Sequence, residues 1–189
     1  MTLSARIDDD CKSLHRYFQR LFDLLQESVA EDKVAPIEVE DAAALESQKT
    51  YSRISHLIKP DMLINVYSLV DFWLKDICNY HRRRTKANLG YRDVRGNDDL
   101  RAFHKYLTKY IALNLASVHA SYTRLQNLRD VRNHLIHHGG HVPDDECLLK
   151  RMSAIPGITL VGTLMVIDDS FVWDVLDCAK TYLCAAAQA

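Results

Sequence analysis

Turn-forming residues are scarce in this chain, and that scarcity limits the folds open to it. Its 189 residues include only 6 glycines and 4 prolines. A β-sandwich or β-barrel needs a turn after every short strand, so a chain with few turn formers favours long helices. Hydrophobic residues make up 48% of the chain and charged residues 26%, as is usual for a globular protein with its own core. We therefore expect an all-α fold.

Apolar residues recur at helical spacing along most of the chain. The first predicted helix carries Leu14, Phe18 and Leu21 at four- and three-residue steps. Pro36 interrupts this pattern, and Pro60 suits the first turn of a later helix, so we expect a new helix to begin there. The other expected elements are helices over about residues 38–57, 98–115, 117–138 and 171–187, with Asn97 or Asp98 as a cap, and a β-hairpin over residues 156–168.

These elements predict one domain over residues 1–189. We expect an up-and-down bundle of about five helices with a small β-hairpin before the C-terminal helix. The N-terminal helices would occupy residues 1–58, and the rest of the bundle residues 59–189.

Composition and charge limit which molecules and compartments this protein can be expected to meet. The net charge is −1 and the isoelectric point is about 6.7, so contact with nucleic acid would need a local basic patch. None of the five cysteines forms a CxxC pair, which suits free thiols in a reducing cytosol. The N-terminus carries acids where a signal peptide would be apolar, and no apolar run approaches the roughly 18 residues of a membrane span. We therefore expect a cytoplasmic protein without membrane contact.

The stretch LRDVRNHLIHHGGH, residues 128–141, holds four of the nine histidines. At about 100° per residue, Arg132 lies within an apolar stripe beside Leu128 and Ile136. A charge there is costly unless it is paired, so Arg132 would either bind a structural carboxylate or be held ready for a phosphate. His137 lies about 140° from Arg132 on the same helix. The two side chains could converge only at the helix end, across two helices or in a symmetric dimer.

Arg132, Asn133 and His137 form a pattern that resembles the signature of the HEPN superfamily, an arginine followed by a polar residue and then a histidine. His138 also fits, although the spacing of His137 is the more common one. The setting is similar too: a helical chain with the motif at the end of a late helix, glycines after it and one more helix to close the bundle. The hairpin resembles a bacterial subgroup linked to defence and toxin systems.

The resemblance implies a metal-independent endoribonuclease that works as a homodimer without a cofactor. Arg132, Asn133 and His137 of both subunits would line a shared cleft and catalyse attack of a ribose 2′-OH on the adjacent phosphate. Histidine titrates near neutrality and can transfer protons, and arginine offers a rigid fork for phosphate oxygens. RNA would be the substrate, and an antitoxin or defence-system protein would be a further partner.

Two other functions remain open for the same residues. One is a non-catalytic HEPN-like module that binds a partner protein or nucleic acid, and the other is a small metal-dependent hydrolase. His134 and His138, like His137 and His141, have the i, i+4 spacing of zinc ligands. The two pairs point to different faces and HExxH is absent, so no metal is expected, and His134 and His141 would be solvated.

Supporting residues come from an earlier helix. Asp71 lies in an apolar run, where an acid needs a partner, and we expect it to hold Arg132. Edge placement with full solvation is the alternative for Asp71. The densest basic run could follow an RNA backbone or could be a solvated helix end that suits the helix dipole. Its members are Arg82, Arg83, Arg84 and Lys86.

Overall fold

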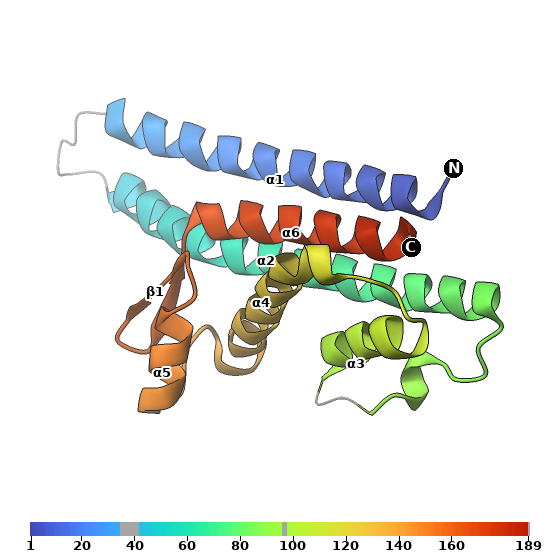
Figure 1. Ribbon diagram of the computed structural model, residues 1–189. Helices are drawn as coiled ribbons and strands as arrows, with labels where there is room; N and C mark the ends of the chain where they lie inside the picture. The colour runs from blue at the N-terminus through green and yellow to red at the C-terminus, as the bar shows by residue number, and fades with distance from the viewer. Residues whose placement is uncertain (35–41, 96–97, 189) are drawn as a thin grey trace.

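A computed structural model describes residues 1–34, 42–95 and 98–188 and is mostly helical (Figure 1). Within these residues there are six α-helices and one two-stranded antiparallel hairpin directly before the last helix. This confirms the predicted helical fold with a hairpin. The elements are α1 (Leu3–Val34), α2 (Ala42–Thr85), α3 (Asp99–Lys105), α4 (His119–His138), α5 (Glu146–Ser153), β1 (Ile158–Val161), β2 (Leu164–Ile167) and α6 (Asp169–Gln188).

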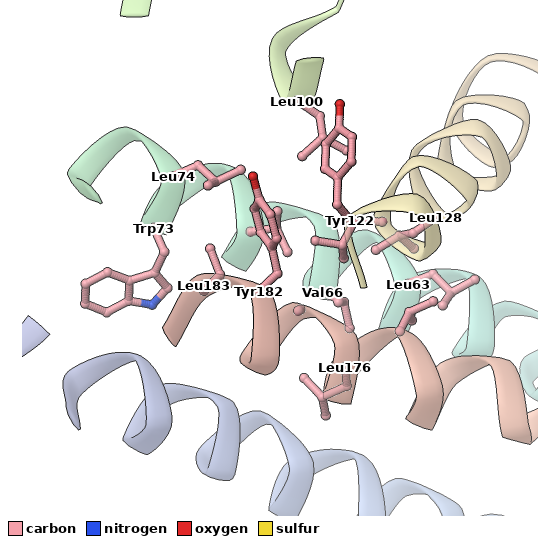
Figure 2. Packing of buried hydrophobic residues seen from close by; sticks show 14 of the residues in the cluster. Leu63, Val66, Trp73, Leu74, Leu100, Tyr122, Leu128, Leu176, Tyr182 and Leu183 are labelled. Carbon is pink, nitrogen blue, oxygen red and sulfur yellow. The ribbon is translucent and has the colours of Figure 1, made fainter. Parts of the chain in front are cut away.

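The core forms around α6, which packs against α1, α2 and α4. In Figure 1, α6 lies between α1 and α2, and α4 runs obliquely to α6 and α2 on the side away from α1. Val66 of α2, Leu128 of α4 and Leu176 of α6 belong to one buried apolar cluster. In Figure 2, Val66 and Leu128 lie between α2, α4 and α6, and Leu176 points from α6 toward α1. Each of these side chains is at most 2% exposed. Burying such a side chain stabilises the fold by about 1.5–3 kcal/mol, so these contacts fix α4 against α2.

The prediction that Pro60 begins a new helix is wrong, because α2 continues through it. An interior proline removes one backbone donor and usually breaks or kinks a helix. Here the preceding residue is held from outside the helix. Lys59 Nζ donates to the Ile167 carbonyl at 3.0 Å and pairs with Asp169 at 2.7 Å. Lys59 thus joins α2 to β2 and α6 directly before the proline. The proposed breaker Pro36 and the proposed cap Asn97 lie outside the described residues.

The start of α3 and the end of α4 are each fixed by a local signal. Asp98 caps α3 as predicted, with its carboxylate accepting from the Arg101 amide at 2.8 Å, and α3 passes into a π-helix over Tyr106–Tyr110. Gly139 then ends α4 in the left-handed conformation, with φ of 59°. The Met165 amide donates to the Gly140 carbonyl at 3.0 Å, which joins the end of α4 to the hairpin.

One helix was not expected. α5 begins after Asp145, whose carboxylate accepts from the Leu148 amide at 2.8 Å, and it buries Met152. The sequence carries this signal as an aspartate followed by apolar residues four apart. No helix in the described part of the chain is both long enough and apolar enough to cross a membrane.

Candidate functional site

A pocket of about 390 Å³ lies between α2, the start of α3 and the second half of α4. It is polar, and it contains three of the residues predicted from the sequence, Arg132, Asn133 and Asp71. The remaining lining residues are Tyr67, Ser68, Asp98, Asp99 and Arg129.

Arg132 is half-buried and lies over the ring of Tyr67, with the guanidinium carbon 5.3 Å from the ring centroid. Its Nη1 donates to the Asn133 side-chain oxygen at 3.2 Å. Its Nε is buried without a hydrogen-bond partner, and no carboxylate of the described residues forms an ion pair with it. A buried donor without an acceptor costs about 1–3 kcal/mol. Arg132 is therefore a partly desolvated cation that is open to an anionic ligand.

The expected ion pair between Asp71 and Arg132 is not formed. Asp71 instead binds Lys75, one turn further along α2, at 2.5 Å. A lysine four residues away on the same helix is a nearer partner than a side chain on another helix. The pKa of the Lys75 ammonium is raised, first by this hydrogen bond and more weakly by the charges of Asp71 and Asp99. Asp71 thus lines the pocket with its charge already paired.

Arg129 is a pocket residue that the sequence analysis did not single out. Its side chain is only 12% exposed and binds Asp98 and Asp130, the second at 2.6 Å. Burial lowers its pKa, but the bonds to both carboxylates outweigh burial and raise it. The available signal was its spacing, because Arg129 lies three residues before Arg132 on the same helical face. Unlike Arg132, Arg129 is saturated by carboxylates and links α4 to the start of α3.

Tyr67 forms the floor beneath Arg132. Burial raises the pKa of its phenol to about 12, so the ring stays neutral at any physiological pH. A neutral ring attracts a cation placed over its face by about 0.5–2 kcal/mol, depending on desolvation. Tyr67 thus holds the Arg132 guanidinium without neutralising its charge.

The structure does not bring Arg132 and His137 together within one chain. α4 is helical without interruption to His138, so Arg132 and His137 remain about 140° apart, as predicted. His137 and His138 are both exposed in the last turn, and Ile136 is 43% exposed rather than buried in the stripe. Arg132 lies against α2, whereas His137 faces away from it.

The interpretation of His134 as a solvated residue is wrong. It is half-buried, and its Nδ1 is buried without a hydrogen-bond partner among the residues that the structure describes. Burial lowers the pKa of His134, and the nearby His138, with its ring centroid 5.5 Å away, lowers it further. His141 is exposed and bonds through Nδ1 to the Thr163 hydroxyl at 3.1 Å. Among the described residues, no group of three or more histidine, cysteine or acidic side chains could hold a metal ion.

The predicted RNA-contacting residues lie at the far end of α2. Arg82 is about four helical turns, or roughly 22 Å, from Tyr67. It donates to the carbonyls of Ala87 at 3.5 Å and Asn88 at 3.3 Å, just beyond the helix end. Lys86 follows in the left-handed conformation, with φ of 54°. Arg83 and Arg84 are exposed in the last turn of α2. The basic run therefore terminates a helix and does not adjoin Arg132.

Comparison of the chain with protein-family models, with curated proteins and with solved structures gave no match. Any function assigned to the pocket must therefore be argued from the residues that line it.

Proposed function

We propose that this protein is a cytoplasmic, metal-independent endoribonuclease of the HEPN type, active as a homodimer and acting in a bacterial defence or toxin–antitoxin system. The observation that supports it best is Arg132, a half-buried guanidinium beside Asn133 and over Tyr67 that has no carboxylate partner in the described part of the chain. A partly desolvated cation that is not neutralised stabilises charge that develops on a phosphate better than a fully solvated one. The resemblance of residues 132–138 to the HEPN signature supplies the reaction class.

The reaction needs two proton transfers and one charged intermediate. The ribose 2′-oxygen attacks the adjacent phosphorus, and its proton passes to a base. The bond from phosphorus to the 5′-oxygen breaks, and that oxygen takes a proton from an acid. The products are a 2′,3′-cyclic phosphate and a 5′-hydroxyl, with no net change in protons. His137 is the proton-transfer group of this proposal, and Arg132 holds the phosphate oxygens.

A second copy of the chain is part of the proposal, because Arg132 and His137 point away from each other. The surface around His137 has the apolar character that such a contact needs. Ile136 is 43% exposed, and on the neighbouring hairpin Leu164 is 41% and Val161 65% exposed. Burial of exposed apolar side chains drives association between protein surfaces. For His137 of one chain to lie near Arg132 of the other, the two-fold contact has to include the mouth of the Arg132 pocket as well as this surface.

The same apolar surface favours one alternative, a non-catalytic module that binds a partner protein such as an antitoxin. The exposed residues Val161, Leu164 and Val166 lie on one face of the hairpin, since Val161 is directly opposite Leu164 in the register. A protein partner could cover this face without any use of Arg132.

The deciding experiment measures cleavage of mixed RNA by the purified protein with and without EDTA. We expect cleavage to survive EDTA and to fall about 100–1000-fold in Arg132→Ala, the usual cost of losing one group that stabilises transition-state charge. Arg83→Ala is the matched control, because Arg83 is an exposed arginine at the far end of α2. Loss of cleavage with EDTA would support a metal enzyme. Absence of cleavage from a folded dimer would support the interaction module.

A mixing experiment tests whether the site is shared between chains. Arg132→Ala and His137→Ala are each expected to be inactive alone. After denaturation and joint refolding, mixed dimers would contain one site with Arg132 from one chain and His137 from the other. We expect part of the cleavage activity to return. A mixture as inactive as its components would contradict the shared cleft, and His141→Ala, which alters another exposed histidine, controls for loss of imidazole at this end.

A further inference from the structure

The charges around the pocket can be assigned partner by partner. Asp71 is paired with Lys75. Asp98 is bonded to Arg101 and Arg129, and Arg129 also binds Asp130. Two lining residues lack such a partner within the described part of the chain, the cation Arg132 and the anion Asp99. Asp99 is exposed and influences Lys75 only through its charge.

A ligand that complements this pocket carries one anionic group and one edge of hydrogen-bond donors. Arg132 offers donors to the anion, and the Asp99 carboxylate offers two acceptor oxygens. A volume of about 390 Å³ is near the small end of the 300–1,000 Å³ typical of ligand pockets, which suits a single nucleotide better than a folded segment. The phosphate of that nucleotide would bind Arg132, and its base would face Asp99.

Guanine is the base whose Watson–Crick edge matches a carboxylate. Its N1–H and its N2 amino group are neighbouring donors, so both can bond the two oxygens of one carboxylate. Adenine and cytosine each place a ring-nitrogen acceptor beside their amino donor, and uracil places an acceptor on either side of its single donor. Each of these acceptors would be repelled by Asp99. Bases in single-stranded RNA are read through this edge.

We infer that the pocket binds a guanine nucleotide, with Asp99 selecting the base and Arg132 holding its phosphate. The inference rests on the proposed function, in which the scissile phosphate lies at Arg132. It adds a substrate class, RNA with guanosine on the 5′ side of the cut, and a specificity residue outside the Arg-Asn-x3-His pattern. After 2′-OH attack that guanosine keeps the phosphate, so 3′-GMP is the appropriate probe.

The test is calorimetric binding of 3′-GMP, 3′-IMP and 3′-AMP to the full chain. Inosine lacks the N2 amino group and therefore removes one of the two donors. We expect 3′-IMP and 3′-AMP to bind about 5–100-fold more weakly than 3′-GMP, the usual discrimination of a bidentate base contact. Asp99→Asn, which replaces one acceptor oxygen by a donor, is expected to abolish the preference, while Asp144→Asn, at an exposed acid on a different loop, is expected to keep it.

The outcomes separate this inference from the proposed function. Equal binding of 3′-GMP and 3′-AMP, a guanine preference that survives in Asp99→Asn, or no binding of any of the three nucleotides would each overturn the inference. Binding does not depend on catalysis, so cleavage of RNA is measured separately on the same samples. Cleavage without base preference would support the proposed ribonuclease and contradict the guanine site. Binding of 3′-GMP that depends on Asp99, without any cleavage of RNA, would support the guanine site and contradict the proposed ribonuclease.

Discussion

Arginines lie at two places along α2, on its own C-terminal end and on α4 where α4 packs beside Tyr67, and their surroundings differ. The basic end, Arg82–Arg84 with Lys86, concentrates positive charge at the surface, where Arg82 bonds backbone carbonyls beyond the helix. The pocket near Tyr67 holds fewer cations, but it partly buries them, and among the described residues Arg132 has no carboxylate partner. Solvent weakens the field of an exposed charge more than that of a partly buried, fixed one. The density of basic residues in the sequence is therefore a poorer guide to the site than the partners each arginine has.

The pocket contains a smaller contrast of the same kind. Arg129 and Arg132 are one helical turn apart on α4, yet Arg129 binds two carboxylates and Arg132 binds none among the described residues. Arg129 thus contributes to stability by joining α4 to α3, and it leaves Arg132 available for a ligand. Replacing Arg129 should therefore lower stability, and replacing Arg132 should lower ligand binding and cleavage.

The largest effect on stability is expected from Arg129→Ala. The substitution leaves the carboxylates of Asp98 and Asp130, which are 19% and 23% exposed, without their common cation. Removing one partner from a largely buried ion pair costs about 3 kcal/mol or more of unfolding free energy. Urea denaturation monitored by circular dichroism measures the change. Arg83→Ala, at an exposed position, should alter stability by less than about 0.5 kcal/mol. A similar small change in Arg129→Ala would show that Arg129 is not a structural residue.

Much of the fold could be predicted because its signals are local. Apolar residues at helical spacing predict α1, α4 and α6, and Gly139 and Gly162 mark the end of α4 and the hairpin turn, both with positive φ. Pro60 misled the prediction, because a proline in the first turn of a new helix and a proline inside a longer helix have the same local pattern.

In the site, too, features set by local sequence could be predicted and features set by tertiary contacts could not. The positions of Arg132 and Asn133 on one helix, and the separation of His137 from them, follow from about 100° per residue. The partner of Arg129 could not be predicted, since Asp98 lies 31 residues away and reaches it only through tertiary packing. The pairing of Asp71 was visible in the sequence, because Lys75 lies four residues later, but the prediction favoured a distant arginine over this local lysine.

The effect of burial on α4 can also be measured as the pH dependence of stability that His134 causes. Burial, and more weakly the charge of His138, lower the pKa of His134 below its usual 6.5, so the folded protein holds this ring neutral while the unfolded chain takes up a proton. Stability is therefore complete above about pH 6.5 and falls as the pH drops below it. In His134→Gln, the loss of unfolding free energy between pH 7.5 and pH 5 should be smaller than in the parent protein. Equal losses in both proteins would show that His134 does not contribute.

The smallest effect is expected at the basic end of α2. Arg82 lies against Gly90, where an added Cβ would come within 3.1 Å of its Nη1, and it bonds the carbonyls of Ala87 and Asn88. A cation at a helix C-terminus stabilises by about 0.3–1 kcal/mol, so Arg82→Ala should lower the unfolding free energy by that amount. Cleavage of RNA should fall less than twofold, because Arg82 is roughly 22 Å along α2 from Tyr67. The contrary result would be weaker RNA binding by Arg82→Ala than by the parent protein at low salt, with no difference between the two at high salt. That result would assign this end of the helix to contact with the RNA backbone. Both arginine regions would then belong to one extended binding surface.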